Sequence, residues 1–220
     1  MSEVRTDLIE KYPYIVIEGP IGCGKTTLAR KLADKYEVNL LLENAEANPF
    51  LSRFYQDAPR YALPTQLFFL FQRVNQIRDM NQRDMFAQCT IADFFLEKDL
   101  IFARLNLDHE EYALYHQMYQ HLQLQATKPD LVIYLQTPVE ALAERIMQRN
   151  ISYEQDIPQE YLTRLANAYS EFFHQYDSSP LLIVNNEKLN IANDDASLDL
   201  LIARILQIRG QREYFNPNFE

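Results

Sequence analysis

The sequence is poor in the features that mark several protein classes. Its two cysteines, Cys23 and Cys89, are too few for the disulfide framework of a small secreted protein. No apolar run reaches the roughly eighteen residues that a membrane span needs, and the polar, acidic N-terminus lacks the pattern of a targeting peptide. Basic residues are outnumbered, 21 against 31 acidic, and the net charge of −10 disfavours binding to nucleic acid or anionic membranes. We therefore expect a cytoplasmic protein with one domain over residues 1–220.

Glycine is also scarce, yet three of the four glycines lie within residues 19–24, and Lys25-Thr26 follows directly. This is the Walker A pattern G-x-x-x-x-G-K-T. A β-branched run at 14–17 predicts a strand before it, and an amphipathic run at 27–33 predicts a helix after it. A glycine loop between strand and helix turns backbone N–H groups onto phosphates, with Lys25 reaching the β- and γ-phosphates and Thr26 binding Mg²⁺. The residues expected to bind ATP are Gly19, Pro20, Ile21, Gly22, Cys23, Gly24, Lys25, Thr26 and Thr27.

Strand and helix patterns alternate along the chain. Short apolar runs predict strands at 14–18, 38–42, 88–92, 131–136 and 181–185. Helical periodicity is clearest over 65–84, 110–125, 139–148 and 159–175. This order predicts an α/β fold of the P-loop NTPase type, with a five-stranded parallel sheet and helices on both faces. We expect the acidic stretch 190–199 to be a solvated loop, and we make no prediction for 209–220.

Two carboxylates come directly after predicted strands. Glu43 follows the second strand and Asp93 follows the third, while Asn185 ends the fifth. Ligands of parallel sheets bind beyond the carboxyl ends of the strands. These residues and the glycine loop are therefore the first candidates for a site.

The region from about 145 to 158 has the pattern of a lid. Arg145 and Arg149 are four residues apart and share one helix face. A short polar loop and a new helix start at Pro158 follow. Such a segment closes over transferring phosphates in many kinases, although two solvated arginines on an exposed face would have the same spacing.

The residues then resemble those of the deoxyribonucleoside kinase family. The stretch 18–28 is close to the phosphate-loop motif of that family, and Asn48-Pro49-Phe50-Leu51 with Phe54-Tyr55 resembles its bacterial deoxyadenosine and deoxyguanosine kinase branch. The match covers most of the chain. The resemblance implies ATP-dependent phosphorylation of the 5′-hydroxyl of a deoxyribonucleoside in nucleotide salvage, with Mg²⁺ as cofactor and a homodimer as the assembly.

The resemblance also implies a role for each matching residue. Glu43 takes the proton of the sugar 5′-hydroxyl, and Lys25, Arg145 and Arg149 neutralise the transferring phosphate. The implied substrate ligands are Tyr55 and Glu154 on the 3′-hydroxyl and Gln66, Arg73 and Asp99 on the base. Thr26 and Asp93 hold Mg²⁺. The Arg73–Asp99 pair is typical of the purine and cytosine branch, so we expect deoxyadenosine or deoxyguanosine, with deoxycytidine as a further candidate.

Two positions depart from the family pattern. The family has arginine directly after the acidic residue of the third strand, where this chain has Phe94, and a third lid arginine where it has Ile151. Arginines stabilise the transition state of phosphoryl transfer, so both losses weaken it. Arg104 or Arg53 would have to compensate, or the enzyme is slow.

Two other functions stay open at this level. A thymidylate-kinase-like nucleoside monophosphate kinase shares the sheet and the loop, but Glu43 would repel its phosphorylated acceptor. A nucleotide-binding relative that has lost catalysis would explain Phe94 and Ile151.

Overall fold

A six-stranded sheet, parallel throughout, forms the centre of the protein in a computed structural model that describes residues 8–83, 89–123, 126–187, 189, 191–192 and 194–217. The strand order is β2-β3-β1-β4-β5-β6, so β1 lies between β3 and β4. The strands are β1 (Tyr14–Glu18), β2 (Asn39–Leu41), β3 (Thr90–Ala92), β4 (Leu131–Gln136), β5 (Leu181–Asn185) and β6 (Arg212–Phe215). The predicted α/β fold with a parallel sheet is confirmed, and the sheet has one strand more than predicted.

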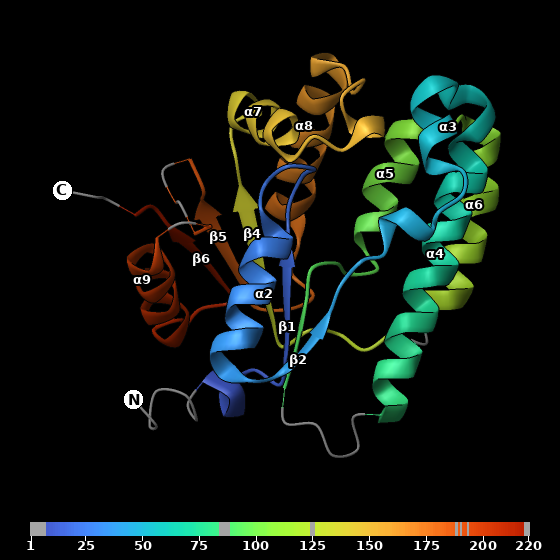
Figure 1. Ribbon diagram of the computed structural model, residues 1–220. Coiled ribbons are helices and arrows are strands. Elements are labelled where there is room, and N and C mark those ends of the chain that lie inside the picture. The colour runs from blue at the N-terminus through green and yellow to red at the C-terminus, as the bar shows by residue number, and fades with distance from the viewer. Residues whose placement is uncertain are drawn as a thin grey trace.

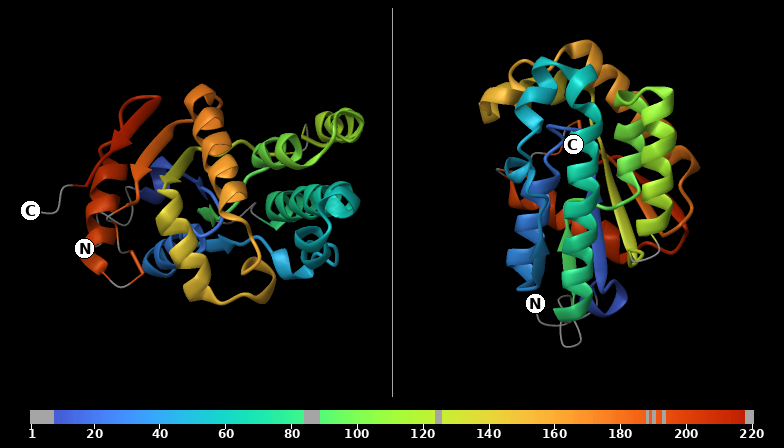
Figure 2. Two further views of the ribbon diagram at one scale, coloured as in Figure 1. Left: turned by 90° about the horizontal axis from the view of Figure 1, so that it is seen from above. Right: turned by 90° about the vertical axis from the view of Figure 1, so that its right-hand side faces the viewer.

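Helices cover both faces of this sheet (Figures 1 and 2). The helices whose bounds are described are α2 (Lys25–Tyr36), α3 (Leu51–Gln56), α4 (Ala58–Arg83), α5 (Lys98–Asn106), α6 (His109–Gln123), α7 (Val139–Arg149), α8 (Gln159–Gln175) and α9 (Asp195–Leu206), with 3₁₀ turns η1 (Ala45–Ala47) and η2 (Ser152–Glu154). The helix predicted over 159–175 has the same bounds as α8. The helix predicted from residue 65 corresponds to α4, which begins earlier, at Ala58. Residues 84, 88 and 125, at the predicted ends of two helices and one strand, lie outside the described residues.

The central strand shows why two helical layers form. Alternate side chains of a strand point to opposite faces of the sheet. Ile15 and Ile17 join the apolar cluster under α2 and α9, while Tyr14 and Val16 join the one under α8. Burial on both faces explains the unbroken apolar runs from which the strands were predicted.

The C-terminal region differs from its prediction. The stretch 190–199 is not a loop throughout, because α9 begins at Asp195. The Asp194 carboxylate caps this helix by accepting hydrogen bonds from the backbone N–H groups of Ala196 and Ser197. Residues 190 and 193 lie outside the described residues. Part of the acidic stretch therefore forms the start of a helix, whereas its composition predicts a loop.

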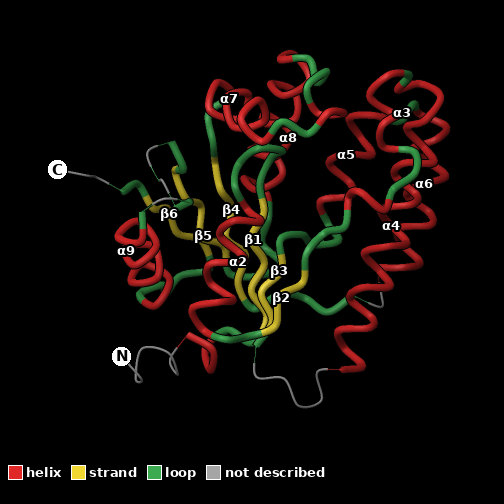
Figure 3. The backbone as a smooth tube through the Cα atoms, in the orientation of Figure 1, coloured by secondary structure: helices red, strands yellow, loops and turns green. Residues whose placement is uncertain are grey.

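The glycine loop joins β1 to α2 at the end of the sheet next to α7 (Figure 3). Gly22 and Gly24 have φ values of 85° and 92°, which side chains with a Cβ rarely adopt. A Cβ on Gly22 would lie 2.8 Å from the Leu142 carbonyl oxygen, whereas one on Gly24 would meet nothing within 4 Å. The loop therefore needs glycine at residue 22 both for its backbone angle and for its contact with α7.

Gly22→Ala is expected to destabilise the protein more than Gly24→Ala does. Both substitutions force an alanine into a left-handed conformation, at a cost of about 1–2 kcal/mol. Only Gly22→Ala adds overpacking, at a further cost of about 1–3 kcal/mol. Urea unfolding of both variants without nucleotide measures the difference, and equal losses of unfolding free energy would refute the contact with α7.

Candidate active site

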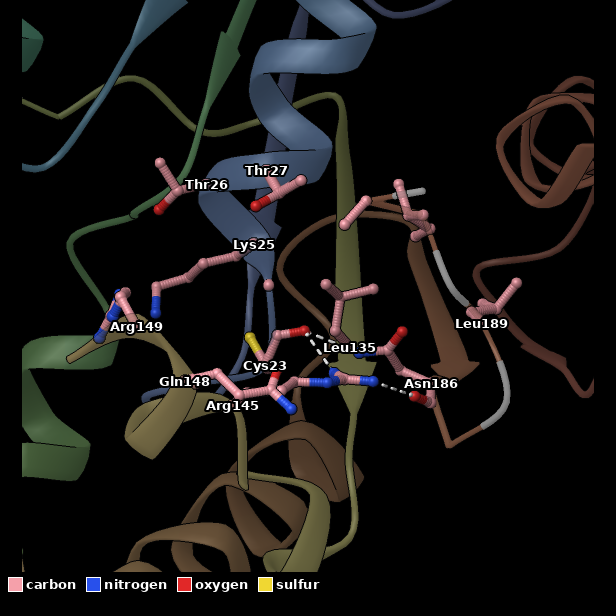
Figure 4. A pocket seen from close by; sticks show the side chains of 14 residues that line it. Cys23, Lys25, Thr26, Thr27, Leu135, Arg145, Gln148, Arg149, Asn186 and Leu189 are labelled. Atoms are coloured by element: carbon pink, nitrogen blue, oxygen red, sulfur yellow. Dashed lines mark hydrogen bonds between the residues drawn. The ribbon is translucent and has the colours of Figure 1, made fainter. Parts of the chain in front are cut away.

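The backbone of the glycine loop is held from two directions beside a cavity of about 440 Å³ (Figure 4). The Cys23 carbonyl oxygen accepts hydrogen bonds from Arg145 Nη1 of α7 at 3.1 Å and from Asn186 Nδ2, just after β5, at 2.7 Å. Arg145 also donates to the Asn186 carbonyl oxygen at 3.2 Å. The loop residues 22–27 line this cavity together with Arg149.

This cavity has the properties of an anion site. The N-terminus of α2 at Lys25 carries backbone N–H groups without helical partners and the positive end of the helix dipole. In Figure 4 the side chains of Lys25 and Arg149 extend to the same side of the loop. Two cations and a helix N-terminus suit a polyphosphate.

A second cavity, of about 420 Å³, adjoins the first. Lys25, Thr26 and Arg149 line both cavities. Further predicted residues meet in the second one, namely Glu43, Tyr55, Gln66, Arg73, Asp93 and Glu154. A group bound in one cavity and a group bound in the other would therefore meet at the loop lysine, as transfer between two substrates requires.

Glu43 is one of the carboxylates that line the second cavity, and its side chain is 16% exposed. Its Oε1 accepts a hydrogen bond from Arg73 Nε at 2.8 Å, and Lys98 Nζ lies 3.1 Å from both carboxylate oxygens. Burial by itself raises the pKa of Glu43, but the cations of Arg73 and Lys98 outweigh burial and hold it well below its usual range. Glu43 is therefore an ionised, fixed carboxylate.

Thr26 and Asp93 lie within hydrogen-bond distance of each other. The Thr26 hydroxyl donates to Asp93 Oδ2 at 2.5 Å, and Asp93 Oδ1 accepts from the Glu43 backbone N–H at 2.7 Å. A hydroxyl and a carboxylate are oxygen ligands that Mg²⁺ binds, with its remaining positions left to water and phosphates. This pair fits the ion at the point where the two cavities meet.

Tyr55 and Glu154 enter the second cavity from two separate segments. Asn48 holds the chain before α3, because its side chain donates to the Thr65 carbonyl oxygen and accepts from the Phe50 N–H. Tyr55 of α3 stacks on Tyr153 of η2, with ring centroids 6.2 Å apart. Burial raises the pKa of Tyr55 well above its ordinary value, so its hydroxyl stays a donor. The Glu154 carboxylate accepts a hydrogen bond from Arg149. The second cavity therefore contains a donor, the Tyr55 hydroxyl, and an acceptor, the Glu154 carboxylate.

Gln66, Arg73 and Asp99 do not share one environment. Gln66 and Arg73 of α4 line the cavity, and both are buried. Arg73 also forms ion pairs with Glu43 and with Asp99, which is fully buried in α5. The pairing of Arg73 with Asp99 that the sequence predicts is present, and it connects to Glu43 as well.

Several residues of the site escaped the sequence analysis. Asn186, not its neighbour Asn185, contacts the glycine loop. Neither candidate for a compensating arginine lines the two cavities: Arg104 donates to the Tyr112 hydroxyl, and Arg53 lies over the Tyr61 ring. Lys98 is a second buried cation beside Glu43, in addition to Arg73, and only its position directly before Asp99 would have pointed to it.

The two departures from the family pattern differ in their surroundings. Phe94 is fully buried in an apolar cluster with residues of α4 and α6, whereas Ile151 lines the second cavity. The side chain at position 94 is thus part of the core.

Among the described residues no helix is long and apolar enough to cross a membrane.

A glycine loop on a parallel sheet, with two cavities meeting at its lysine, is the arrangement of a P-loop phosphotransferase. A deoxynucleoside kinase family model matches residues 15–208. The deoxyguanosine kinase of Bacillus subtilis is 29% identical over 89% of this chain and 97% of that protein, and the deoxyadenosine kinase of Lactobacillus acidophilus is 28% identical over 85% and 92%. A solved structure of deoxyadenosine kinase from M. mycoides with bound dCTP superposes with a TM-score of 0.77, at 27% identity over 89% of this chain and all of that one.

The chain belongs to the deoxynucleoside kinase family. The family resemblance and the class of enzyme predicted from the sequence, a deoxynucleoside kinase, are confirmed.

Proposed function

We propose that the protein transfers the γ-phosphoryl group of ATP to the 5′-hydroxyl of a purine deoxynucleoside, with deoxycytidine as a weaker acceptor. The main support for this proposal is the Glu43 carboxylate in the second cavity. That cavity shares Lys25, Thr26 and Arg149 with the first one, the cavity beside the glycine loop (the loop cavity). A carboxylate there suits a neutral hydroxyl and repels the phosphate of a nucleotide acceptor.

The transfer step uses Glu43 as orienting group and proton acceptor. The 5′-oxygen attacks the γ-phosphorus, its O–H bond breaks, and the proton passes to Glu43, while ADP leaves with the electrons of the broken P–O bond. Because Arg73 and Lys98 keep the pKa of Glu43 low, the proton moves late, after the forming P–O bond has made the hydroxyl acidic. Glu43 thus chiefly aligns the nucleophile.

The charge of the transferring group is met by protein cations and by magnesium. Lys25 and Arg149 line both cavities, so they are placed to contact the phosphate on each side of the transfer. Arg145 contributes indirectly by holding the Cys23 carbonyl of the loop. Thr26 and Asp93 would hold Mg²⁺, which when bound neutralises the β- and γ-phosphates of ATP.

The acceptor is recognised by neutral and charged groups together. The Tyr55 hydroxyl and the Glu154 carboxylate offer a donor and an acceptor for the 3′-hydroxyl. The Gln66 amide offers both to one edge of the base. Arg73, held by Asp99, adds donors that suit a purine acceptor.

A substrate panel tests this proposal. ADP release with Mg-ATP is measured for the four deoxynucleosides and their monophosphates at matched concentrations. We expect the highest kcat/KM with deoxyadenosine or deoxyguanosine, and little turnover of any monophosphate. Thymidine as the best acceptor would contradict the base preference, and turnover confined to a monophosphate would contradict the role of Glu43.

We also propose that the enzyme works in the cytoplasm as a homodimer formed through α4 and α6. Phe71 of α4 and Leu114 of α6 are large apolar side chains that are 44% and 51% exposed. Cys23 and Cys89, the two cysteines of the sequence, are buried and are not joined by a disulfide, which suits a reducing compartment. Sedimentation velocity of the whole chain measures the assembly, and a monomer at micromolar concentration would argue against it.

A further inference from the structure

Lys98 is a buried lysine that the transfer step described above does not explain. It is 2% exposed at the first residue of α5. Burial lowers the pKa of Lys98, and the positive end of its own helix dipole disfavours its charge. Arg73 and Lys25, two further cations, lie close enough to oppose it as well. A charged lysine at this position is therefore unfavourable unless other groups stabilise it.

Two carboxylates, one at the end of β1 and one in the loop after β2, offset these costs. Lys98 Nζ lies 3.1 Å from both Glu43 oxygens and 3.8 Å from Glu18 Oε2. Glu18 ends β1 and is fully buried, and its Oε1 accepts hydrogen bonds from the Gly19 N–H and the Tyr169 hydroxyl. Its Oε2 accepts no hydrogen bond from any residue that the structure describes. Oε2 therefore has the ammonium group of Lys98 as its partner.

Glu18 thus connects Lys98 to the glycine loop. The Glu18 side chain is fixed by the backbone of Gly19, the first loop residue, and by Tyr169 of α8. Lys98 then extends the contact to Glu43. The chain of contacts runs from the loop that would hold ATP to the carboxylate that would hold the acceptor.

The same contacts bear on the position after Asp93. An arginine stands there in the family pattern, but Phe94 packs among apolar residues of α4 and α6. Lys98, four residues further on, brings a cation to Glu43 from the start of α5. The positive charge that is missing at position 94 is present at Lys98.

We propose that Lys98 is a positioning residue for phosphoryl transfer, whose ammonium group is anchored by Glu18, orients the Glu43 carboxylate, and supplies the positive charge missing after Asp93. This inference rests on the proposed function, because it acts through Glu43. Arg73 holds Oε1 of Glu43 from α4, and Lys98 holds the carboxylate from α5. With both cations in place, the carboxylate has one orientation toward the acceptor.

Kinetics of Lys98→Met test the proposal. We expect kcat to fall by about 10²-fold, the cost of a misplaced catalytic group, with the KM values for ATP and deoxynucleoside little changed. Lys31→Met is the matched control, since Lys31 pairs with Asp195 on the surface. A wild-type enzyme without deoxynucleoside turnover would refute the proposed function itself, whereas an active wild type with equal kcat in Lys98→Met would refute only the role of Lys98.

A double variant separates positioning from simple charge balance. Lys98→Met leaves Glu18 buried beside an apolar group, so its Tm is expected to fall. Glu18→Gln/Lys98→Met removes one charge of each sign and is expected to regain most of that Tm while kcat stays low. If kcat of the double variant returned to the wild-type value, Lys98 would merely neutralise Glu18, and the proposal would be wrong.

Discussion

Glu43→Gln is expected to lower kcat for deoxynucleoside phosphorylation by about 10²–10⁴-fold, the usual contribution of a positioned general base. Glutamine keeps the shape of the side chain but cannot accept the proton of the 5′-hydroxyl. It also removes the negative charge that Arg73 and Lys98 share. Because Glu43 lies outside the loop cavity, the affinity for ATP should be nearly unchanged. Steady-state kinetics and ATP binding by calorimetry measure the two effects separately.

The control for this substitution is Glu140→Gln. Glu140 is exposed in the first turn of α7, so its loss is expected to leave kcat as it is. A Glu43→Gln enzyme with kcat close to that of the wild type would show that another group receives the proton. A parallel loss of ATP binding would instead mean that Glu43 supports the glycine loop.

Lys25→Met should reduce kcat/KM by about 10³-fold, because it removes the cation nearest the point where phosphate passes between the substrates. Lys25 lines both cavities, and among the cations of the described residues Arg149 alone shares that position. Methionine retains most of the length and bulk of the lysine side chain, so packing at the start of α2 is preserved. The change therefore isolates the charge. Initial rates at saturating and limiting ATP show whether binding or transfer is lost.

Lys35→Met serves as its comparison. Lys35 lies in the same helix, and its side chain pairs with Asp199 at the surface. Surface ion pairs contribute little to stability, so this variant should match the wild type in rate and nearly in Tm. If Lys25→Met kept wild-type activity, the loop would not be the site of ATP.

Local sequence patterns were sufficient for the inner part of the fold. The strands 14–18, 131–136 and 181–185 are apolar runs buried on both faces of the sheet, and such runs are visible without tertiary information. β6 was missed because Arg212–Phe215 has no apolar run and is an edge strand, which among the described strands pairs with β5 alone. Its place in the sheet depends on a neighbour that the local sequence does not specify.

In the candidate site, too, some residues could be predicted from the sequence and others could not. Lys25 and Thr26 belong to a contiguous motif, and Glu43 and Asp93 follow predicted strands, so sequence position alone brought them into consideration. Lys98 has no such motif. Its role can be recognised only in the folded protein, where β1, the loop after β2 and the start of α5 bring three charged side chains together.

The most direct measurement is a competition between a nucleoside and its nucleotide. The wild-type enzyme is given γ-labelled Mg-ATP with equal concentrations of deoxyadenosine and its 5′-monophosphate, and the labelled products are separated by chromatography. A neutral acceptor held by Glu43 predicts label in the 5′-monophosphate, and Glu43→Gln should remove that product. Label in the diphosphate, or no labelled product while ATP still binds, would contradict a deoxynucleoside kinase that works through Glu43.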